Sequence, residues 1–298
     1  MTSAGRFAPS PSGELHVGNL RTAILAWLFA RSTGRQFLMR VEDLDRARAG
    51  AEAEQLRDLA AIGVTWDGGV VRQTEREPLY AEAISRLAAA GMTYECFCTR
   101  REIQEAPSAP HAPQGAYPGT CRNIDPAELE FKRTIRPAAI RLRAAVRDWT
   151  VEDQLHGTYT GMVDDFVLRR NDGVTAYNLA VVVDDAAQGV DQVVRGDDLL
   201  PSTPRQAYLA SLLHVPVPEY AHVPLVVNSD GARLAKRDGA VTLADLAFAG
   251  LDAGHVRDVI LESLGLPAGP LEKALAVFDP AGLPRDPWVW PGAAGVGA

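Results

Sequence analysis

A proline-, serine- and glycine-rich loop precedes the first helical pattern of the sequence and carries His16, followed by Gly18 and Asn19. Helix N-termini attract anions because their first backbone N–H groups are unpaired and the helix dipole is positive there. His16 adds a donor where phosphate charge would collect. A single His-x-Gly is more often a plain strand-to-helix turn, so this loop alone is a moderate signal for phosphate binding.

A second candidate for phosphate binding is the glycine-flanked segment 232–239, which contains the adjacent cations Lys236 and Arg237. Two cations on such a loop suit a triphosphate. Taken alone, a solvated basic turn is the commoner use of this pattern. The two loops gain weight only when they are considered together.

The three cysteines of the chain, Cys96, Cys98 and Cys121, lie in one short segment. Three thiolates and one further donor can complete a tetrahedral Zn²⁺ site, which would be structural rather than catalytic. Local chemistry makes His111 the conventional fourth ligand. Three inert thiols are the alternative, which the clustering makes improbable. Their odd number and an N-terminus without signal-peptide features argue against a secreted disulfide framework, so we expect a cytoplasmic protein.

The elements that would position these groups alternate between strands and helices. We expect strands at 6–9 and 37–41, a helix from Leu20, and a second helix broken by Gly63. This alternation predicts an α/β fold with a parallel sheet. Further strands are expected at 181–183, 193–194 and 223–227, with helices opening at 203 and around 256–264, and a mobile tail beyond Asp279.

Composition sets limits on the partners. The 298 residues are 47% apolar and 23% charged, which is typical of a globular protein. With 30 basic and 38 acidic residues the net charge is −8, so any contact with nucleic acid must be local. The basic stretch 132–147 is the one obvious patch for phosphate. The longest apolar run, 23–30, is too short to span a membrane.

Together the two loops resemble the HIGH and KMSKS signatures of class I aminoacyl-tRNA synthetases, in the right order around an insertion. Other stretches are similar to the glutamyl-tRNA synthetase catalytic core, and these are 6–13, 40–45, 177–180, 184–185 and 194–196. The resemblance covers about residues 5–245. It implies a Rossmann-like catalytic domain (1–90 and 172–228), a zinc-containing insertion (91–171), and a KMSKS-like loop with a short helical C-terminal subdomain and mobile tail (229–298).

The resemblance also implies the site residues. Arginine forks match carboxylates, so Arg6 and Arg195 suit an acidic amino acid, with Glu42 for its ammonium group. The implied glutamate site is Arg6, Phe7, Ala8, Pro9, Ser10, Glu42, Tyr177 and Arg195. The implied ATP site is His16, Gly18, Asn19 and Lys236, with His16 and Lys236 as catalytic residues. The implied zinc ligands are Cys96, Cys98, Tyr117 and Cys121.

Departures from the glutamyl-tRNA synthetase pattern indicate a branch of the family. Asn19 ends the HIGH-like element, Arg233 and Ala235 replace the usual Lys and Ser, and Val181 replaces a common Asn. The sequence ends about sixty residues after Lys236, so we expect no anticodon-binding domain. These features resemble the truncated glutamyl-Q branch.

That branch implies tRNA-independent activation of L-glutamate with Mg²⁺ and ATP to glutamyl-adenylate. The glutamate then passes to the cyclopentenediol of queuosine, the wobble base of tRNA(Asp), whose anticodon loop would enter the site. The alternatives are a minimal glutamyl-tRNA synthetase that charges tRNA(Glu), a non-enzymatic paralogue that binds tRNA or glutamate, and another nucleotidyltransferase. We expect a monomer with no membrane partner.

Overall fold

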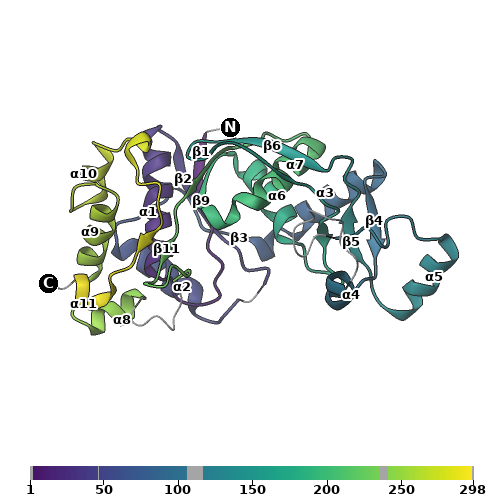
Figure 1. Cartoon of the computed structure of the whole chain (residues 1–298), viewed down its shortest axis with the longest axis horizontal. Helices are drawn as coiled ribbons and strands as arrows, with labels where there is room; N and C mark the ends of the chain where they lie inside the picture. Colours follow the sequence, from purple (N-terminus) through teal and green to yellow (C-terminus); the bar gives the residue numbers. More distant parts are fainter. Residues whose placement is uncertain (1–2, 46, 106–116, 235–240, 297–298) are drawn as a thin grey trace.

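A seven-stranded, mainly parallel sheet forms the centre of the molecule in a computed structural model that describes residues 3–45, 47–105, 117–234 and 241–296 (Figure 1). Its strand order is β3-β2-β1-β9-β10-β6-β7, and β7 alone runs antiparallel to its neighbour. The strands are β1 (Ala4–Phe7), β2 (Gln36–Val41), β3 (Val71–Arg72), β6 (Asp148–Asp153), β7 (Gly157–Met162), β9 (Val190–Gly196) and β10 (Glu219–Val223). The expected α/β class with a parallel sheet is confirmed.

Helices surround this sheet and extend the molecule at both ends. The α-helices are α1 (Val17–Ser32), α2 (Ala51–Ala61), α3 (Glu77–Ala89), α4 (Arg100–Glu105), α5 (Pro126–Ile135), α6 (Tyr177–Gln188), α7 (Thr203–Leu213), α8 (Leu243–Phe248), α9 (Ala253–Ser263), α10 (Leu271–Leu275) and α11 (Gly292–Val296). The 3₁₀ helices among the described residues are η1 (Gln73–Glu75), η2 (Asp197–Ser202) and η4 (Pro280–Gly282). Within the described parts of the chain, no helix has the length and apolar character needed to cross a membrane.

Two main hydrophobic clusters hold the layers together. In one, α1 covers Phe37, Met39 and Val194, which alternate along β2 and β9 with residues that face the other way, and α9 and α10 pack on α1. The other lies among α3, α6 and α7. The strands that carry the site are therefore fixed by packing on helices from distant parts of the chain.

The cysteine-bearing segment has a sheet of its own at the end of the molecule opposite α9 and α10 (Figure 1). This antiparallel sheet contains β4 (Thr93–Cys96), β5 (Ala139–Leu142) and β8 (Val167–Arg169). The hairpin β6–β7 joins the main sheet instead, where Asp153 pairs with Tyr220 of β10. The expected insertion, 91–171, is thus divided between two sheets.

The structure corrects the expected strand at 181–183, because these residues lie inside α6. A run of valines favours a strand by intrinsic propensity. Here α6 packs on α3, α7 and β9, and it buries residues at helical spacing, including Ala180, Val181, Asp184 and Asp185. Tertiary packing outweighs the local preference.

Two further expectations differ from the structure near the C-terminus. The expected strand at 223–227 is interrupted by Pro224 and continues as β11 (Val226–Val227). The expected mobile tail instead forms β12 (Trp288–Val289), which pairs in parallel with β11. The Trp290 side chain is buried, and Trp288 N–H donates to Leu225 O at 2.9 Å. Burial of the Trp290 ring holds this C-terminal segment in place, although its proline and glycine content had suggested a mobile tail.

Candidate active site

A cavity of about 810 Å³ opens at the carboxyl ends of β1 and β9, where parallel α/β sheets bind ligands. Its walls include every described residue of the predicted glutamate and ATP sites: Arg6, Phe7, Ala8, Pro9, Ser10, His16, Gly18, Asn19, Glu42, Tyr177 and Arg195. Lys236 lies outside the described residues. The structure therefore brings the two predicted sets into one space.

One end of the cavity is the N-terminus of α1. His16 is its N-cap residue, and its Nδ1 accepts a hydrogen bond from Gly18 N–H at 3.1 Å. The Asn19 side chain accepts one from His16 N–H at 3.2 Å, which completes a reciprocal cap. These bonds fix the imidazole beside the positive end of the helix.

The imidazole of His16 is neutral at physiological pH. Burial and the nearby Arg233 lower its pKa to about 4. Because Nδ1 accepts the bond from Gly18, the neutral ring carries its proton on Nε2. This end of the cavity therefore offers a neutral N–H donor and a helix terminus, both suited to phosphate oxygens.

At the other end of the cavity, Arg6 of the cavity wall belongs to a set of buried ion pairs that lie behind it. Asp185 of α6 accepts from Arg40 Nη1 at 2.7 Å and from Arg6 Nε at 3.4 Å. Burial would raise the pKa of Asp185, but Arg40 and Arg6 outweigh it and lower the pKa. Asp185 is therefore ionised and holds the Arg6 guanidinium in place.

Glu42 follows β2 and lines the same end. Its carboxylate lies 3.4 Å from Arg40 Nη2, and its N–H donates to Pro9 O at 3.0 Å. Burial raises the pKa of Glu42, while Arg40 and Arg6 oppose the shift. A cationic group of a ligand would favour the ionised form of this carboxylate.

Arg195 is held on three sides. It donates from Nε to His222 Nε2 at 3.0 Å, from Nη2 to Thr203 Oγ1 at 2.9 Å, and from Nη1 to the Tyr177 hydroxyl at 3.4 Å. A guanidinium has five N–H donors, so two remain without a bond to the described protein. They are available to a carboxylate in the cavity.

Sequence reasoning missed the residues that hold these arginines. Arg40 and Asp185 fall within stretches that carried the family resemblance, but nothing local gave them a role. Thr203, His222 and Asp153 come from three different elements. Their pairing depends on the strand order, which the sequence does not display.

The basic stretch 132–147 is largely occupied by contacts within the protein. Lys132 pairs with Glu128 at 3.0 Å, and Arg133 pairs with Glu95 at 2.6 Å. Arg141 is buried, with its guanidinium 3.6 Å from the centre of the Tyr117 ring. These contacts weaken the expectation of a phosphate-binding patch.

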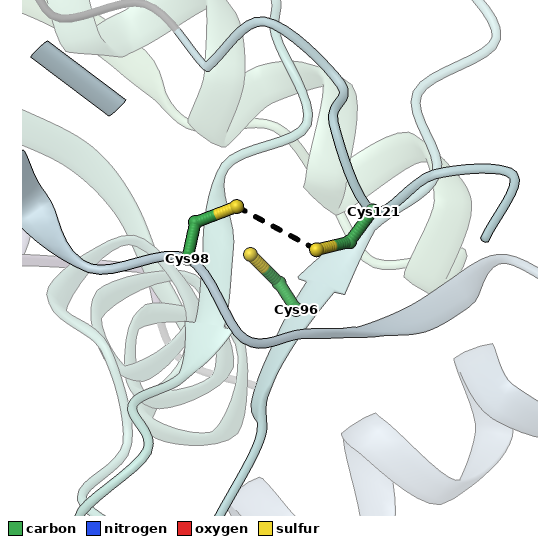
Figure 2. Close-up of side chains that lie close together, drawn as sticks. All are labelled: Cys96, Cys98 and Cys121. Atoms are coloured by element: carbon green, nitrogen blue, oxygen red, sulfur yellow. Dashed lines mark hydrogen bonds between the residues drawn. The ribbon is translucent and has the colours of Figure 1, made fainter. Parts of the chain in front are cut away.

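The three cysteines meet between β4 and the loop that precedes α5 (Figure 2). Their sulfur atoms lie within 4.8 Å of one another, and those of Cys98 and Cys121 are 3.5 Å apart. Hydrogen bonding with Cys121 lowers the pKa of the Cys96 thiol, which favours a thiolate there. This cluster could hold a metal ion.

Tyr117 brings a fourth donor to the cluster. Its hydroxyl lies 3.3 Å from Cys96 Sγ and 3.6 Å from Cys98 Sγ. The backbone N–H of Tyr117 donates to Asp164 at 3.1 Å, and the Arg141 guanidinium lies over the Tyr117 ring, so both the backbone and the phenol ring of Tyr117 have partners that hold them. His111, the alternative ligand, lies outside the described residues. The donor set at this place fits a tetrahedral Zn²⁺ ion.

Comparisons with known proteins agree with this architecture. A family model described as tRNA synthetases class I (E and Q), catalytic domain, matches residues 4–283. A glutamate-tRNA synthetase structure from Elizabethkingia anophelis matches with a TM-score of 0.84 at 25% identity, covering 98% of this chain and 68% of that chain.

Sequence relatives are closer. A glutamyl-Q tRNA(Asp) synthetase of Nocardia farcinica is 67% identical over 287 residues, covering 96% of this chain and 92% of the relative. One from Cutibacterium acnes is 53% identical over 270 residues, covering 89% and 77%. With such identity over nearly its whole length, the chain belongs to the glutamyl-Q tRNA(Asp) synthetase family of class I aminoacyl-tRNA synthetases.

Proposed function

We propose that the protein activates L-glutamate with ATP and Mg²⁺ without tRNA, and then transfers the glutamyl group to queuosine in tRNA(Asp). The observation that carries this proposal is the polarity of the cavity. One end presents the Arg6 and Arg195 guanidinium groups, and the other presents a helix N-terminus with a neutral histidine. An amino acid with two carboxylates and a nucleotide match these two ends.

At the amino-acid end, Arg6 and Arg195 bind the carboxylate of the side chain and Glu42 binds the ammonium group. The donors are fixed before the substrate arrives, because Asp185 holds Arg6 and His222 holds Arg195. Fixed donors avoid the cost of ordering flexible cations around the ligand. Tyr177 completes this wall.

At the phosphate end, His16 Nε2–H and the N-terminus of α1 contact the ATP phosphates, and Lys236 adds a charge. An oxygen of the glutamate α-carboxylate attacks the α-phosphorus, the bond to the bridging oxygen breaks, and pyrophosphate leaves. The protein contributes by aligning the reactants and stabilising charge on the phosphate oxygens.

The acceptor approaches through a neighbouring cavity of about 420 Å³, which shares Ser10, Ser12, Glu42 and Tyr177 with the first. A cyclopentenediol hydroxyl then attacks the activated carbonyl carbon, the bond from that carbon to the phosphate oxygen breaks, AMP leaves, and the hydroxyl proton passes to water. An anticodon loop suits this route because RNA is usually read where its bases are unpaired and splayed. Because the contact is limited to one RNA loop, it is compatible with the net negative charge of the protein.

We also propose that the cysteine cluster binds one structural Zn²⁺ through Cys96, Cys98, Cys121 and the Tyr117 phenol. The ion would link the end of β4 to the loop before α5 and would take no part in the reaction. Metal analysis of protein purified without chelator tests this. About one zinc per chain supports the site, and well under one contradicts it.

The test of the proposed reaction uses labelled glutamate, ATP and tRNA from queuosine-replete and queuosine-deficient cells. Label in tRNA(Asp) from replete cells alone is the expected result. Label in tRNA(Glu) from both sources would establish a minimal charging enzyme instead. Glutamate-dependent ATP–pyrophosphate exchange without label in either tRNA would support the first step and contradict the acceptor.

A further inference from the structure

Two buried side chains outside the cavity lie directly behind Arg195. His222 is opposite Arg195 in the register of β9 and β10, and its Nε2 is 3.0 Å from Arg195 Nε. Asp153 of β6 is next in line, with Oδ2 2.6 Å from His222 Nδ1. The His222 and Asp153 side chains are both fully buried. Three adjacent strands thus carry a carboxylate, an imidazole and a guanidinium in a row.

The direction of each bond in this row is determined by chemistry. An arginine in a protein is always protonated and has donors only, so its Nε–H must donate to His222 Nε2. The proton of the neutral imidazole then lies on Nδ1 and donates to Asp153. Burial lowers the pKa of His222 and Arg195 lowers it further, although Asp153 opposes the shift.

Asp153 is itself held by the backbone. Its Oδ1 accepts from Leu155 N–H at 2.9 Å and His156 N–H at 3.0 Å, and its Oδ2 accepts from His222 N–H at 3.1 Å. The carboxylate therefore cannot turn away from the imidazole without losing several bonds. Thr203 Oγ1, 3.1 Å from His222 Nε2 and 2.9 Å from Arg195 Nη2, braces the other end of the row.

We propose that Asp153 and His222 are positioning residues that fix the imidazole tautomer and thereby aim Arg195 at a carboxylate side chain in the cavity. This deepens the proposed function and rests on it where glutamate is concerned. The pair touches neither substrate. Its contribution is to selectivity for a carboxylate over a carboxamide, because a misaimed guanidinium loses its paired geometry.

The substitution Asp153→Asn tests the pair. The asparagine oxygen takes the place of Oδ1, keeps the bonds from Leu155 and His156 N–H, and lies about 3.4 Å from His222 N–H. Its NH₂ group takes the place of Oδ2, loses the bond from His222 N–H, donates to Nδ1 and drives the imidazole proton to Nε2. Two donors, His222 Nε2–H and Arg195 Nε–H, then face each other. We expect the KM for glutamate in ATP–pyrophosphate exchange to rise about 10- to 100-fold, the KM for ATP to change less than about twofold, and preference for glutamate over glutamine to fall.

Nitrogen-15 NMR of the histidine ring gives a readout that a merely structural role would not move. The expected assignment for His222 is the Nδ1–H tautomer in the wild type and the Nε2–H tautomer in Asp153→Asn. Asp67→Asn is the matched control, because Asp67 also accepts from a backbone N–H and an arginine, Phe37 and Arg31, but does not line the cavity. It should leave both KM values and the His222 tautomer unchanged.

The substitution His222→Gln separates tautomer control from packing. The glutamine oxygen can accept from Arg195 without a choice of tautomer, so adding Asp153→Asn to it should raise the KM for glutamate little further. An Nε2–H tautomer in the wild type, or an unchanged KM for glutamate in Asp153→Asn, would overturn the proposal. Failure of the wild type to use glutamate at all would instead contradict the proposed function. The NMR assignment would still show whether Asp153 sets the tautomer of His222.

Discussion

The two ends of the cavity are built in different ways. At the phosphate end, His16, Gly18 and Asn19 bond to one another within a single turn at the start of α1. At the amino-acid end, Arg6 and Arg195 depend on Asp185 and His222, which are far from them in sequence. The phosphate end is therefore a local sequence motif, whereas the amino-acid end depends on how the strands and helices of the sheet are arranged.

The difference follows from the charge that each end must bury. A helix terminus offers partial charges that need no counter-ion, so a short motif suffices. A guanidinium that is nearly excluded from water needs partners with good geometry, because an unpaired buried charge is costly. Arg6 and Arg195 are only 4% and 5% exposed, so their partners must come from neighbouring strands and helices.

The largest expected effect comes from breaking the amino-acid end with Arg195→Ala. Removing the guanidinium withdraws the donors for the carboxylate and removes the bonds that Arg195 makes to His222 Nε2 and Thr203 Oγ1. We expect glutamate-dependent ATP–pyrophosphate exchange to fall about 1000-fold in kcat/KM, with little change in the KM for ATP.

Arg35→Ala is the control for that substitution. Arg35 also forms ion pairs, with Asp191 and Glu219, but it does not line the cavity. Its removal should leave the exchange reaction within about twofold of the wild type, since such pairs at the surface contribute little. Equal losses in the two variants would point to a general effect of lost arginines.

At the phosphate end, Lys236→Ala should lower kcat for the exchange reaction about 100-fold, because a cation that meets developing phosphate charge acts in the transition state. The KM for glutamate should change little, in contrast with Arg195→Ala. Lys132→Ala, which removes a lysine paired with Glu128 in α5, is the control. Near-normal exchange in Lys236→Ala would remove its catalytic role.

This contrast also explains how much of the molecule can be predicted from sequence. The loop around His16, the strand that carries Arg6 and the strand that Glu42 follows are visible in the sequence because each is a short, continuous pattern. The helix at Val181–Val183 is not, since its valines favour a strand until packing on α3 and α7 is known. The row Asp153–His222–Arg195 is also hidden, because it depends on β6 joining β10.

A smaller effect is expected on stability at acid pH. His16 has a folded-state pKa of about 4, below the 6.5 of a free imidazole, so the unfolded chain binds more protons between these values. The folded protein should lose about 1–3 kcal/mol of stability from this group as the pH falls from 6.5 to 4. His16→Asn keeps a cap acceptor and lacks this titration.

Urea denaturation at pH 7 and pH 4.5 measures that difference. The loss of unfolding free energy between the two values should be smaller in His16→Asn than in the wild type. His214→Asn is the matched control, since His214 is exposed and has a left-handed backbone with φ of 56°, which asparagine adopts readily. Equal losses in the wild type and His16→Asn would refute the depressed pKa of His16.

The smallest effect should come from Gly18→Ala, which should displace the His16 imidazole at the phosphate end without lowering the stability of the protein. A Cβ at Gly18 would lie 3.0 Å from His16 Nδ1 and Cε1 and 3.3 Å from Val226 Cβ, so the imidazole must shift by a few tenths of an ångström. Alanine is favoured over glycine in a helix by about 0.5–1 kcal/mol, so the melting temperature should not fall. The KM for ATP should nevertheless rise about threefold, because the His16 donor is displaced relative to the phosphates.

Gly254→Ala is the control, because Gly254 is the second residue of α9 after the cap residue Asp252, as Gly18 is in α1 after His16; it should change only stability. An unchanged KM for ATP in Gly18→Ala would mean that the phosphate end tolerates a small shift of the His16 imidazole. We expect the amino-acid end not to tolerate a similar shift of Arg6 or Arg195, because their charges are buried.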